Sequence, residues 1–261
     1  MKSAIKYILI GCGGALLAAA MILACTAGVS VRKTLTCERL EIAILDSMQN
    51  SFVSKVDVKS YLDKEYGTYI GIALDSLDLT RMEDIIDGRS AVLKSQAYVT
   101  KDGSLHIDVT QRKPIVRFQK KDGGFYADAE GYIFPLQRSY ASHVQIIDGN
   151  IPLAANSGYK GAIGDPKEKK WFEDMMKVVN HIEKDRKWKD KIVQISVDAK
   201  GDIILIPREG NEQFHFGQPS DIAEKFRKME KYYTHIVPAK GTGHYKIVDL
   251  KYRGQIVCRE K

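Results

Sequence analysis

The sequence lacks the residue spacings that mark most enzyme and metal sites. Its 261 residues contain no phosphate-binding glycine loop, no nucleophile elbow and no His-Glu-x-x-His motif. The six histidines are scattered without metal-ligand spacing, and there is no zinc-finger spacing. The sequence therefore predicts a protein that is not an enzyme and that uses no cofactor, metal or small-molecule substrate.

Charge of one sign is not concentrated anywhere in the chain. The 40 Lys and Arg residues exceed the 33 Asp and Glu residues by seven, and they are spread along the chain. Because a nucleic-acid interface needs a basic patch and usually a recognisable motif, no nucleic-acid partner is expected. A content of 44% hydrophobic residues and only seven prolines is ordinary for a folded protein of one or two domains.

One short match to a catalytic motif has a simpler explanation. Ser157 to Lys160 fits the S-x-x-K of penicillin-recognising enzymes, and the KGTG at 240–243 loosely resembles their K-T-G. The serine of that motif opens a long buried helix, whereas Ser157 lies among glycines that indicate a loop. No S-x-N element lies between the two matches. A lipoprotein hydrolase that uses Ser157 and Lys160 is therefore only a minor alternative.

An uncharged run of 23 residues occupies positions 7–29. About 20 apolar residues suffice for a transmembrane helix, and the run is longer than the apolar region of a cleaved signal peptide. A lipoprotein signal ending at Cys25 is the other alternative, although Leu23 fits that pattern poorly. The prediction is an uncleaved transmembrane helix at 7–29 after a tail at 1–6. Basic residues flank the run on both sides, so charge does not determine its orientation.

The next segment predicts a small α+β domain at residues 36–118. Its order is strand, helix, helix, strand, strand, with both helices on one face of a three-stranded sheet. The signals in chain order are an alternating run at 37–45, a capping box at Ser54 and Asp57, a second helix start at Thr80 and Glu83, and a hairpin turn at Asp102-Gly103.

The remaining residues, 119–261, predict a mainly antiparallel β domain with two amphipathic helices. Helical stripes of apolar residues occur within 166–188 and 220–237, and short β-like runs surround them. The whole soluble part is thus expected to be α+β. It ends on two β-like runs that flank Arg253-Gly254, so the last strand is expected at a sheet edge, where it could pair with another chain.

Two cysteines of this part leave an alternative open. Cys37 and Cys258 lie near its two ends and could form a disulfide outside the cytoplasm, or could remain two free thiols. Cys12 and Cys25 fall within the apolar run and are interpreted as small apolar residues.

Several motifs in this order resemble the FtsQ/DivIB family of bacterial cell-division proteins. FVSKVDVKSYL and GIALDSLDLTRMEDII resemble the helical part of its POTRA domain, and AYVTKDGSLHIDVTQRKPIVRF resembles its closing hairpin, with Arg112 and Pro114 in an R-x-P position. FYADAEGYIFPL is similar to the D-x-x-G-x-x-F element that opens the β domain. IVDLKYRGQIVC resembles the final strand pair. Each motif is weak alone, and the ordered series carries the resemblance.

The resemblance implies a non-enzymatic scaffold of the divisome in the inner membrane. It implies a cytoplasmic N-terminus, a periplasmic C-terminal part, enrichment at the septum and FtsB-like and FtsL-like coiled-coil partners that help control septal peptidoglycan synthesis. In the family a partner segment adds a strand beside the last strand. The residues that match this docking site are Tyr252, Gln255, Ile256, Val257 and Cys258.

A second function class is a POTRA-containing component of outer-membrane assembly or secretion. Such a component would carry several POTRA repeats, whereas the sequence shows no internal repeat.

Overall fold

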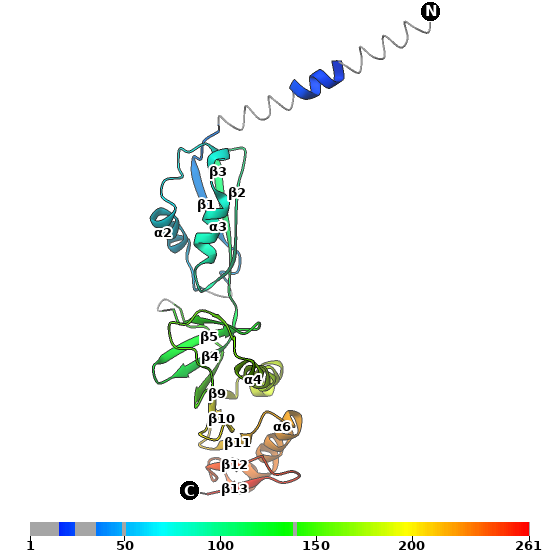
Figure 1. The fold of residues 1–261 in the computed structure, drawn as a ribbon. Coiled ribbons are helices and arrows are strands. Elements are labelled where there is room, and N and C mark those ends of the chain that lie inside the picture. The colour runs from blue at the N-terminus through cyan, green and yellow to red at the C-terminus, as the bar shows by residue number, and fades with distance from the viewer. Residues whose placement is uncertain (1–15, 24–34, 49–50, 138–139, 261) are drawn as a thin grey trace, which may run out of the picture. The chain divides into compact units, whose positions relative to one another are not determined.

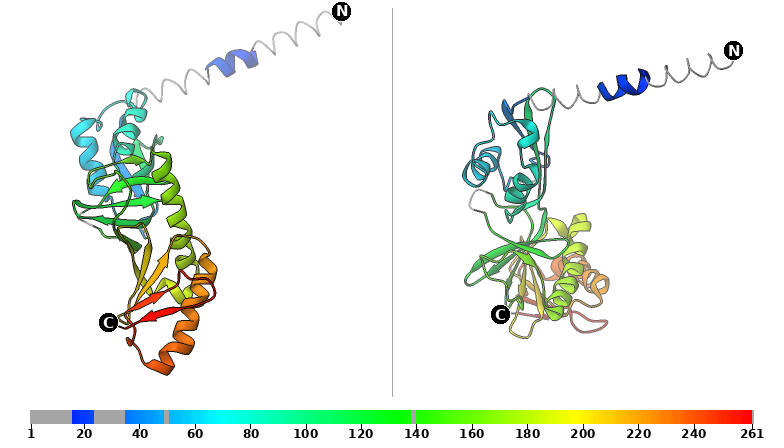
Figure 2. Two further views of the ribbon diagram at one scale, coloured as in Figure 1. Left: turned by 60° about the horizontal axis from the view of Figure 1, so that its bottom comes forward. Right: turned by 45° about the horizontal axis from the view of Figure 1, so that its top comes forward.

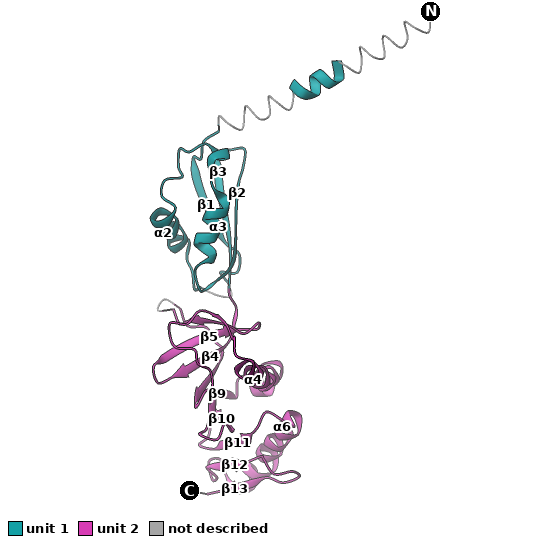
Figure 3. Cartoon of the chain, viewed as in Figure 1, with its two compact units in different colours: residues 1–111 teal, residues 112–261 magenta. Residues whose placement is uncertain are grey.

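The computed structural model describes residues 16–23, 35–48, 51–137 and 140–260. The chain forms two compact units, residues 1–111 and 112–261 (Figure 3). The boundary predicted after residue 118 differs from this division, because the strand that contains residues 114–118 pairs within the second unit.

Only part of the predicted membrane anchor can be described. Residues 16–23 are helical and their side chains are exposed. Among the described residues, no helix is both long enough and apolar enough to cross a membrane. The tail at 1–6, Cys12, Cys25 and the remainder of the 7–29 run lie outside the described residues.

The first unit has the predicted order of strands and helices (Figure 1). Ser54 forms the predicted capping box, because its Oγ accepts the Asp57 N–H at 3.2 Å and Asp57 Oδ2 accepts the Ser54 N–H at 2.9 Å. The elements are β1 (Arg39–Ile44), α2 (Lys55–Glu65), the short 3-10 helix η1 (Leu74–Ser76), α3 (Leu79–Asp87), β2 (Val92–Val99) and β3 (Ser104–Gln111).

The sheet of this unit has the order β1-β3-β2. The central strand β3 is parallel to β1 and antiparallel to β2, and Ile42 of β1 lies beside Ile107. Alternate residues of β3 are fully buried, as are apolar residues of both helices, so the helices and one face of the sheet form a single core. These buried residues are Val58, Leu62, Met82, Ile86, Leu105, Ile107 and Val109.

The start of α3 differs from the prediction. Asp78, not Thr80, caps the helix by accepting the Arg81 N–H at 3.0 Å. Glu83 is therefore not part of a capping box. Its carboxylate instead accepts the backbone N–H of Ala97 in β2 at 2.7 Å.

A second carboxylate of α3 bonds the same strand. Asp87 Oδ1 accepts the Ser95 N–H at 2.6 Å. Because Thr100 donates its N–H to Ser104 across the β2–β3 hairpin, alternation directs the N–H groups of Ser95 and Ala97 away from β3. Two outer donors of β2, those of Ser95 and Ala97, are thus satisfied by side chains of α3, which hinders pairing of another strand along this part of the edge.

The second unit contains a long mixed sheet and two main helices (Figure 1). Its elements are β4 (Pro114–Lys120), β5 (Gly123–Asp128), β6 (Tyr132–Pro135), β7 (Gln145–Gly149), β8 (Gly161–Ala162), α4 (Pro166–Lys184), α5 (Arg186–Lys189), β9 (Ile192–Val197), β10 (Ile203–Pro207), β11 (Gln213–Gly217), α6 (Ile222–Lys231), the π-helical turn η2 (Tyr232–Ile236), α7 (Val237–Lys240), β12 (Ile247–Asp249) and β13 (Val257–Arg259).

The ten strands form one sheet in the order β13-β12-β11-β10-β9-β7-β4-β5-β6-β8. Six of the nine pairings within the described chain are antiparallel and three are parallel. Helices α4 and α6 lie on the same side of the sheet in both views of Figure 2. The mainly antiparallel sheet with two helices that the sequence predicts is therefore present.

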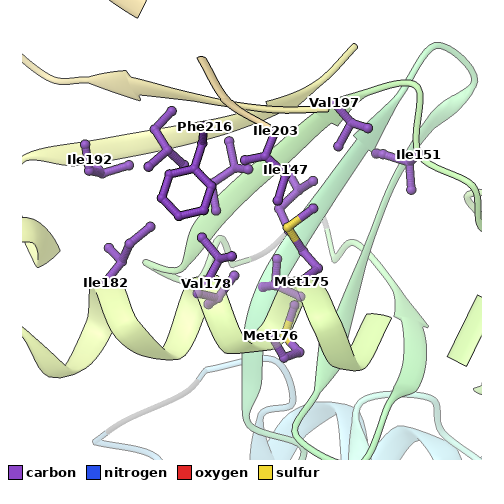
Figure 4. Packing of buried hydrophobic residues seen from close by; sticks show 14 of the residues in the cluster. Ile147, Ile151, Met175, Met176, Val178, Ile182, Ile192, Val197, Ile203 and Phe216 are labelled. Atoms are coloured by element: carbon purple, nitrogen blue, oxygen red, sulfur yellow. The ribbon is translucent and has the colours of Figure 1, made fainter. Parts of the chain in front are cut away.

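Helix α4 supplies much of the core. Met175, Val178 and Ile182 point from one side of the helix toward the strands, where Ile147 and Ile203 meet them (Figure 4). All five side chains are almost completely buried. The apolar stripe seen in the sequence is thus the contact face of this helix.

A largely buried ion pair connects Arg112, two residues before β4, to the turn between β5 and β6. Arg112 Nη1 lies 2.9 Å from Asp128 Oδ2, and the guanidinium carbon lies 3.5 Å from the centre of the Tyr132 ring. Asp128 Oδ1 also accepts the backbone N–H groups of Glu130 and Tyr132, and Gly131 completes the turn with a φ of 77°. The motifs containing Arg112 and Asp128 therefore form one structural joint.

Loss of the Glu83 carboxylate should destabilise the first unit. Glu83→Ala leaves the partly buried N–H of Ala97 without its acceptor, for an expected loss of about 1–3 kcal/mol in the free energy of unfolding. Urea unfolding of the purified chain measures this loss. Asp84→Ala, at the next and exposed position of α3, is the control and should change stability little. Equal effects of the two substitutions would contradict the edge-blocking role.

Removal of the Arg112 side chain should reduce the free energy of unfolding at least as much as Glu83→Ala does. Arg112→Ala leaves the Asp128 carboxylate buried without its cation, with an expected loss of about 3 kcal/mol in the free energy of unfolding of the second unit. The exposed neighbour Lys113 provides the control, since Lys113→Ala removes a cation that is not buried. Thermal unfolding, monitored by circular dichroism, distinguishes the two variants. An unchanged transition temperature for Arg112→Ala would contradict a stabilising role of the Arg112–Asp128 ion pair.

Candidate functional site: the C-terminal sheet edge

Strand β13 is the last strand of the ten-stranded sheet. It pairs antiparallel with β12, and Cys258 lies opposite Val248. No other strand in the described part of the chain pairs with the outer side of β13. This edge is therefore available for a further strand.

The backbone direction shows which groups that strand would meet. Lys246 donates its N–H to the carbonyl oxygen of Arg259 at 3.0 Å, so Arg259 directs its backbone groups inward, toward β12. Because successive residues of a strand alternate in direction, Cys258 directs its N–H and C=O outward. Cys258 thus presents one donor and one acceptor at the edge.

The side chains of the edge divide between two faces. Ile256 and Cys258 pack against the hydrophobic core of the second unit. Val257, between them, therefore points to the opposite face, where it is half-exposed. Burial raises the pKa of the Cys258 thiol, so this cysteine remains neutral and contributes packing rather than charge.

The predicted docking residues do not all belong to the strand. Gln255 and Ile256 precede β13, which begins at Val257 and includes Arg259. Tyr252 lies in the turn between β12 and β13, and its side chain is 46% exposed. The predicted edge segment therefore lies near the edge, but the paired strand is shorter and starts later.

A buried lysine that sequence reasoning missed fixes this turn. The Lys228 Nζ donates to the carbonyl oxygens of Leu250 at 3.1 Å and Tyr252 at 2.6 Å. It also lies 3.2 Å from Glu224 Oε1, and this hydrogen bond is the main reason why the pKa of Glu224 is lowered. The spacing of Glu224 and Lys228 is that of an ordinary surface pair on a helix, so no signal in the sequence indicates that the amine bonds a distant turn.

A hollow of about 520 Å³ lies beside the turn. Helix α6 lines it with Arg227, Lys228 and Lys231 against the single carboxylate of Glu224, and Gln255 and Ile256 line its other side. The excess of cationic side chains favours an acidic group in the hollow. The edge thus combines main-chain hydrogen-bonding groups with a basic rim.

The helix behind the edge has an irregular turn that brings two tyrosines inward. In η2, Tyr232 and Tyr233 both contact Phe214 of β11, with ring centres 5.4 and 5.6 Å apart. Tyr233 donates its hydroxyl proton to Glu212 at 2.9 Å, and burial raises the pKa of Tyr232 to about 12. Strand β11 pairs with β12, so these rings support the sheet just inside its edge.

The other candidate residues form no site in the described structure. Cys37 and Cys258 are free thiols, so the structure contains no disulfide between them. Ser157 lies in an exposed turn rather than at the start of a helix, and Lys160 is also exposed. Nowhere in the described residues do His, Cys, Asp and Glu side chains gather in a group that could hold a metal ion.

Lys228 should control the order of the edge. Lys228→Met keeps the aliphatic stem but removes both hydrogen bonds to the turn, with an expected loss of about 1.5–3 kcal/mol in stability. The substitution should also accelerate amide hydrogen exchange in β13, and it should accelerate exchange in β9 much less. Lys231→Met, on the exposed side of the same helix, should change neither quantity. Unchanged amide exchange at residues 252–259 in Lys228→Met would contradict the role of the Lys228 hydrogen bonds in ordering the turn.

Models of two known protein families match this chain. A POTRA-like domain model matches residues 35–110, and the model described as FtsQ/DivIB, C-terminal related matches residues 113–259, which is more than half of the chain. Comparison with curated proteins found no match. The resemblance drawn from the sequence motifs is confirmed. The chain belongs to the FtsQ/DivIB family, with a POTRA-like domain followed by the family's C-terminal domain.

Proposed function

We propose that this protein is a non-enzymatic, single-pass membrane scaffold of the bacterial divisome. It binds FtsB-like and FtsL-like coiled-coil partners at the C-terminal sheet edge and thereby helps control septal peptidoglycan synthesis. The observation that carries the proposal is the open outer side of β13 in a chain of this family.

The edge suits a partner that adds a strand. Added strands gain affinity from main-chain hydrogen bonds and specificity from side chains that alternate between the faces. Cys258 offers the outward N–H and C=O, and the half-exposed Val257 offers a side-chain contact. The exposed ring of Tyr252 and the basic rim at Arg227 add contacts for an apolar and an acidic side chain of the partner.

The membrane part of the proposal comes from the uncharged run at 7–29 and from the family. That run is long enough for a transmembrane helix, and a divisome scaffold of this family has its N-terminus in the cytoplasm and its bulk in the periplasm. Basic residues after the run do not oppose this orientation, because large domains translocate largely regardless of flanking charge. We accordingly propose the inner membrane at the septum as its location.

In-cell photocrosslinking tests the docking edge. A photoreactive residue at Val257 should give an adduct with a small single-pass coiled-coil protein, because Val257 is half-exposed beside the open strand. The same residue at Lys184, an exposed position in the last turn of α4, should give none. Mass spectrometry of the adduct identifies the partner.

A proline variant separates main-chain pairing from simple proximity. In the chain with the probe at Val257, Cys258→Pro removes the outward N–H, and proline is tolerated where an edge N–H faces away from the sheet. The adduct should fall at least tenfold while thermal unfolding keeps a single transition at a similar temperature. A specific adduct of undiminished yield would overturn pairing through the β13 backbone. Absence of any adduct from Val257 would overturn this edge as the docking site.

A further inference from the structure

One end of the sheet in the first unit is formed by the residues that follow the uncharged run in the chain. Strands β1 and β3 are parallel and β2 runs the opposite way, so β1 and β3 start where β2 ends. Glu38 donates its N–H to the carbonyl oxygen of Gly103 at 2.8 Å, which places the β2–β3 turn here as well. We call this the near end, and it comprises residues 35–38, 69–75 and 99–103.

Only a short stretch of chain separates the near end from the uncharged run. The run ends at residue 29, and six residues further along the chain reaches Leu35. Six residues span at most about 20 Å even when they are fully extended. The carbonyl oxygen of Leu35 accepts the Leu74 N–H at 2.9 Å, so Leu35 already belongs to the folded unit. The near end therefore lies within about 20 Å of the last residue of the run.

Backbone hydrogen bonds hold a loop beside these first residues of the unit. Cys37 donates its N–H to the carbonyl oxygen of Ile72 at 2.8 Å, and its own carbonyl oxygen accepts the Gly71 N–H at 2.8 Å. The loop between α2 and η1 is thus fixed at the near end and cannot move away from it without the loss of these bonds.

The same loop exposes two large aliphatic side chains. Ile70 is 48% exposed and Ile72 is 38% exposed, whereas Tyr69 and Leu74 on either side are buried. Exposed apolar side chains that lie together on a folded surface mark contacts with a protein or a membrane. The short connection to the uncharged run favours the membrane.

A small hollow adds apolar surface at the near end. Its volume is about 290 Å³, and Leu35, Leu74 and Val99 supply its apolar lining. The charged residues beside it are Asp75 and Lys101. Apolar groups with polar groups next to them suit the boundary between lipid headgroups and acyl chains.

The charges of the near end do not favour an anionic surface. Glu38 and Asp75 are exposed and outnumber the exposed amine of Lys101, while Asp102 is paired with Arg39. Attachment to a membrane can come from buried apolar area or from attraction to anionic lipids. At the near end only the first of these is available, so the contact should not depend on lipid charge.

We propose that the near end of the first unit lies against the membrane surface, with Ile70 and Ile72 in the interfacial layer of the lipid. This contact rests on the membrane location proposed above, since the run at 7–29 must end in the bilayer for the short connection to hold the near end there. The contact sets the direction in which β1 leaves the membrane.

Tryptophan quenching by brominated lipid tests the contact. The full chain is placed in nanodiscs of brominated phosphatidylcholine, and the emission of its two native tryptophans, measured on the parent chain, is subtracted. The emission added by Ile72→Trp should be at least twofold lower than in nanodiscs of unbrominated lipid. It should respond equally at low and high salt, because screening does not weaken an apolar contact.

Leu93→Trp is the matched control for this variant. Leu93 is 51% exposed, and it lies in β2 six residues, or about 20 Å, from Val99 at the near end. The emission added by Leu93→Trp should be the same in both lipids. Leu17→Trp, within the described part of the uncharged run, reports whether the run itself lies in the bilayer and should be quenched.

A second substitution separates an apolar contact from simple proximity. In the chain with Ile72→Trp, Ile70→Asp places a charge in the contact and should abolish the quenching, whereas Leu93→Asp should leave it unchanged. Quenching in Leu17→Trp but not in Ile72→Trp would overturn the contact and leave the membrane location standing. Absence of quenching in Leu17→Trp would overturn both. Quenching in Ile72→Trp that is lost at high salt or is insensitive to Ile70→Asp would overturn the role of the aliphatic side chains.

Discussion

An open β-sheet ends in two strands whose outer backbone groups have no strand to bond, and the two sheets in the described part of the chain have four such ends. Two of these ends are limited as templates for another strand. Carboxylates of α3 bond two outer donors of β2, and β8 is only two residues long. The other two ends, β1 and β13, have no comparable protection within the described residues. In the second unit one end strand is very short and the other, β13, is open, and the functional proposal depends on that open edge.

Local sequence signals predicted the elements of the fold well. The capping box at Ser54, the Asp102-Gly103 turn and the apolar stripe of α4 all reflect interactions between residues close in the chain, and the structure contains each of them. The predicted start of α3 was wrong, because Asp78 and Thr80 both have side chains that suit an N-cap and the sequence does not distinguish them. The predicted capping role of Glu83 was also wrong. Its carboxylate bonds Ala97 of β2, which lies 14 residues away in the sequence and comes close only in the folded unit.

The candidate site was less predictable. A strand at the C-terminus could be expected at an edge, and β13 is one. Its limits were not predictable from alternation alone, because Ile256 packs on the core from a loop position that precedes the strand. Lys228 was missed since its hydrogen bonds go to carbonyl oxygens more than 20 residues later in the chain, and a lysine on a helix normally points to solvent. The order of the strands in the sheet also could not be predicted from the sequence, because no local signal indicates the parallel pairing of β11 with β12.

The hydrogen bonds of Lys228 have a kinetic consequence for any partner of the edge. They hold the turn before β13 in one conformation in the folded chain, so its conformational entropy is already lost before a partner arrives. Association then needs no slow ordering of the scaffold, and only the incoming segment must become ordered. The rate of capture would accordingly be set by diffusion and by the flexibility of the partner, and the lifetime of the complex by the added strand itself.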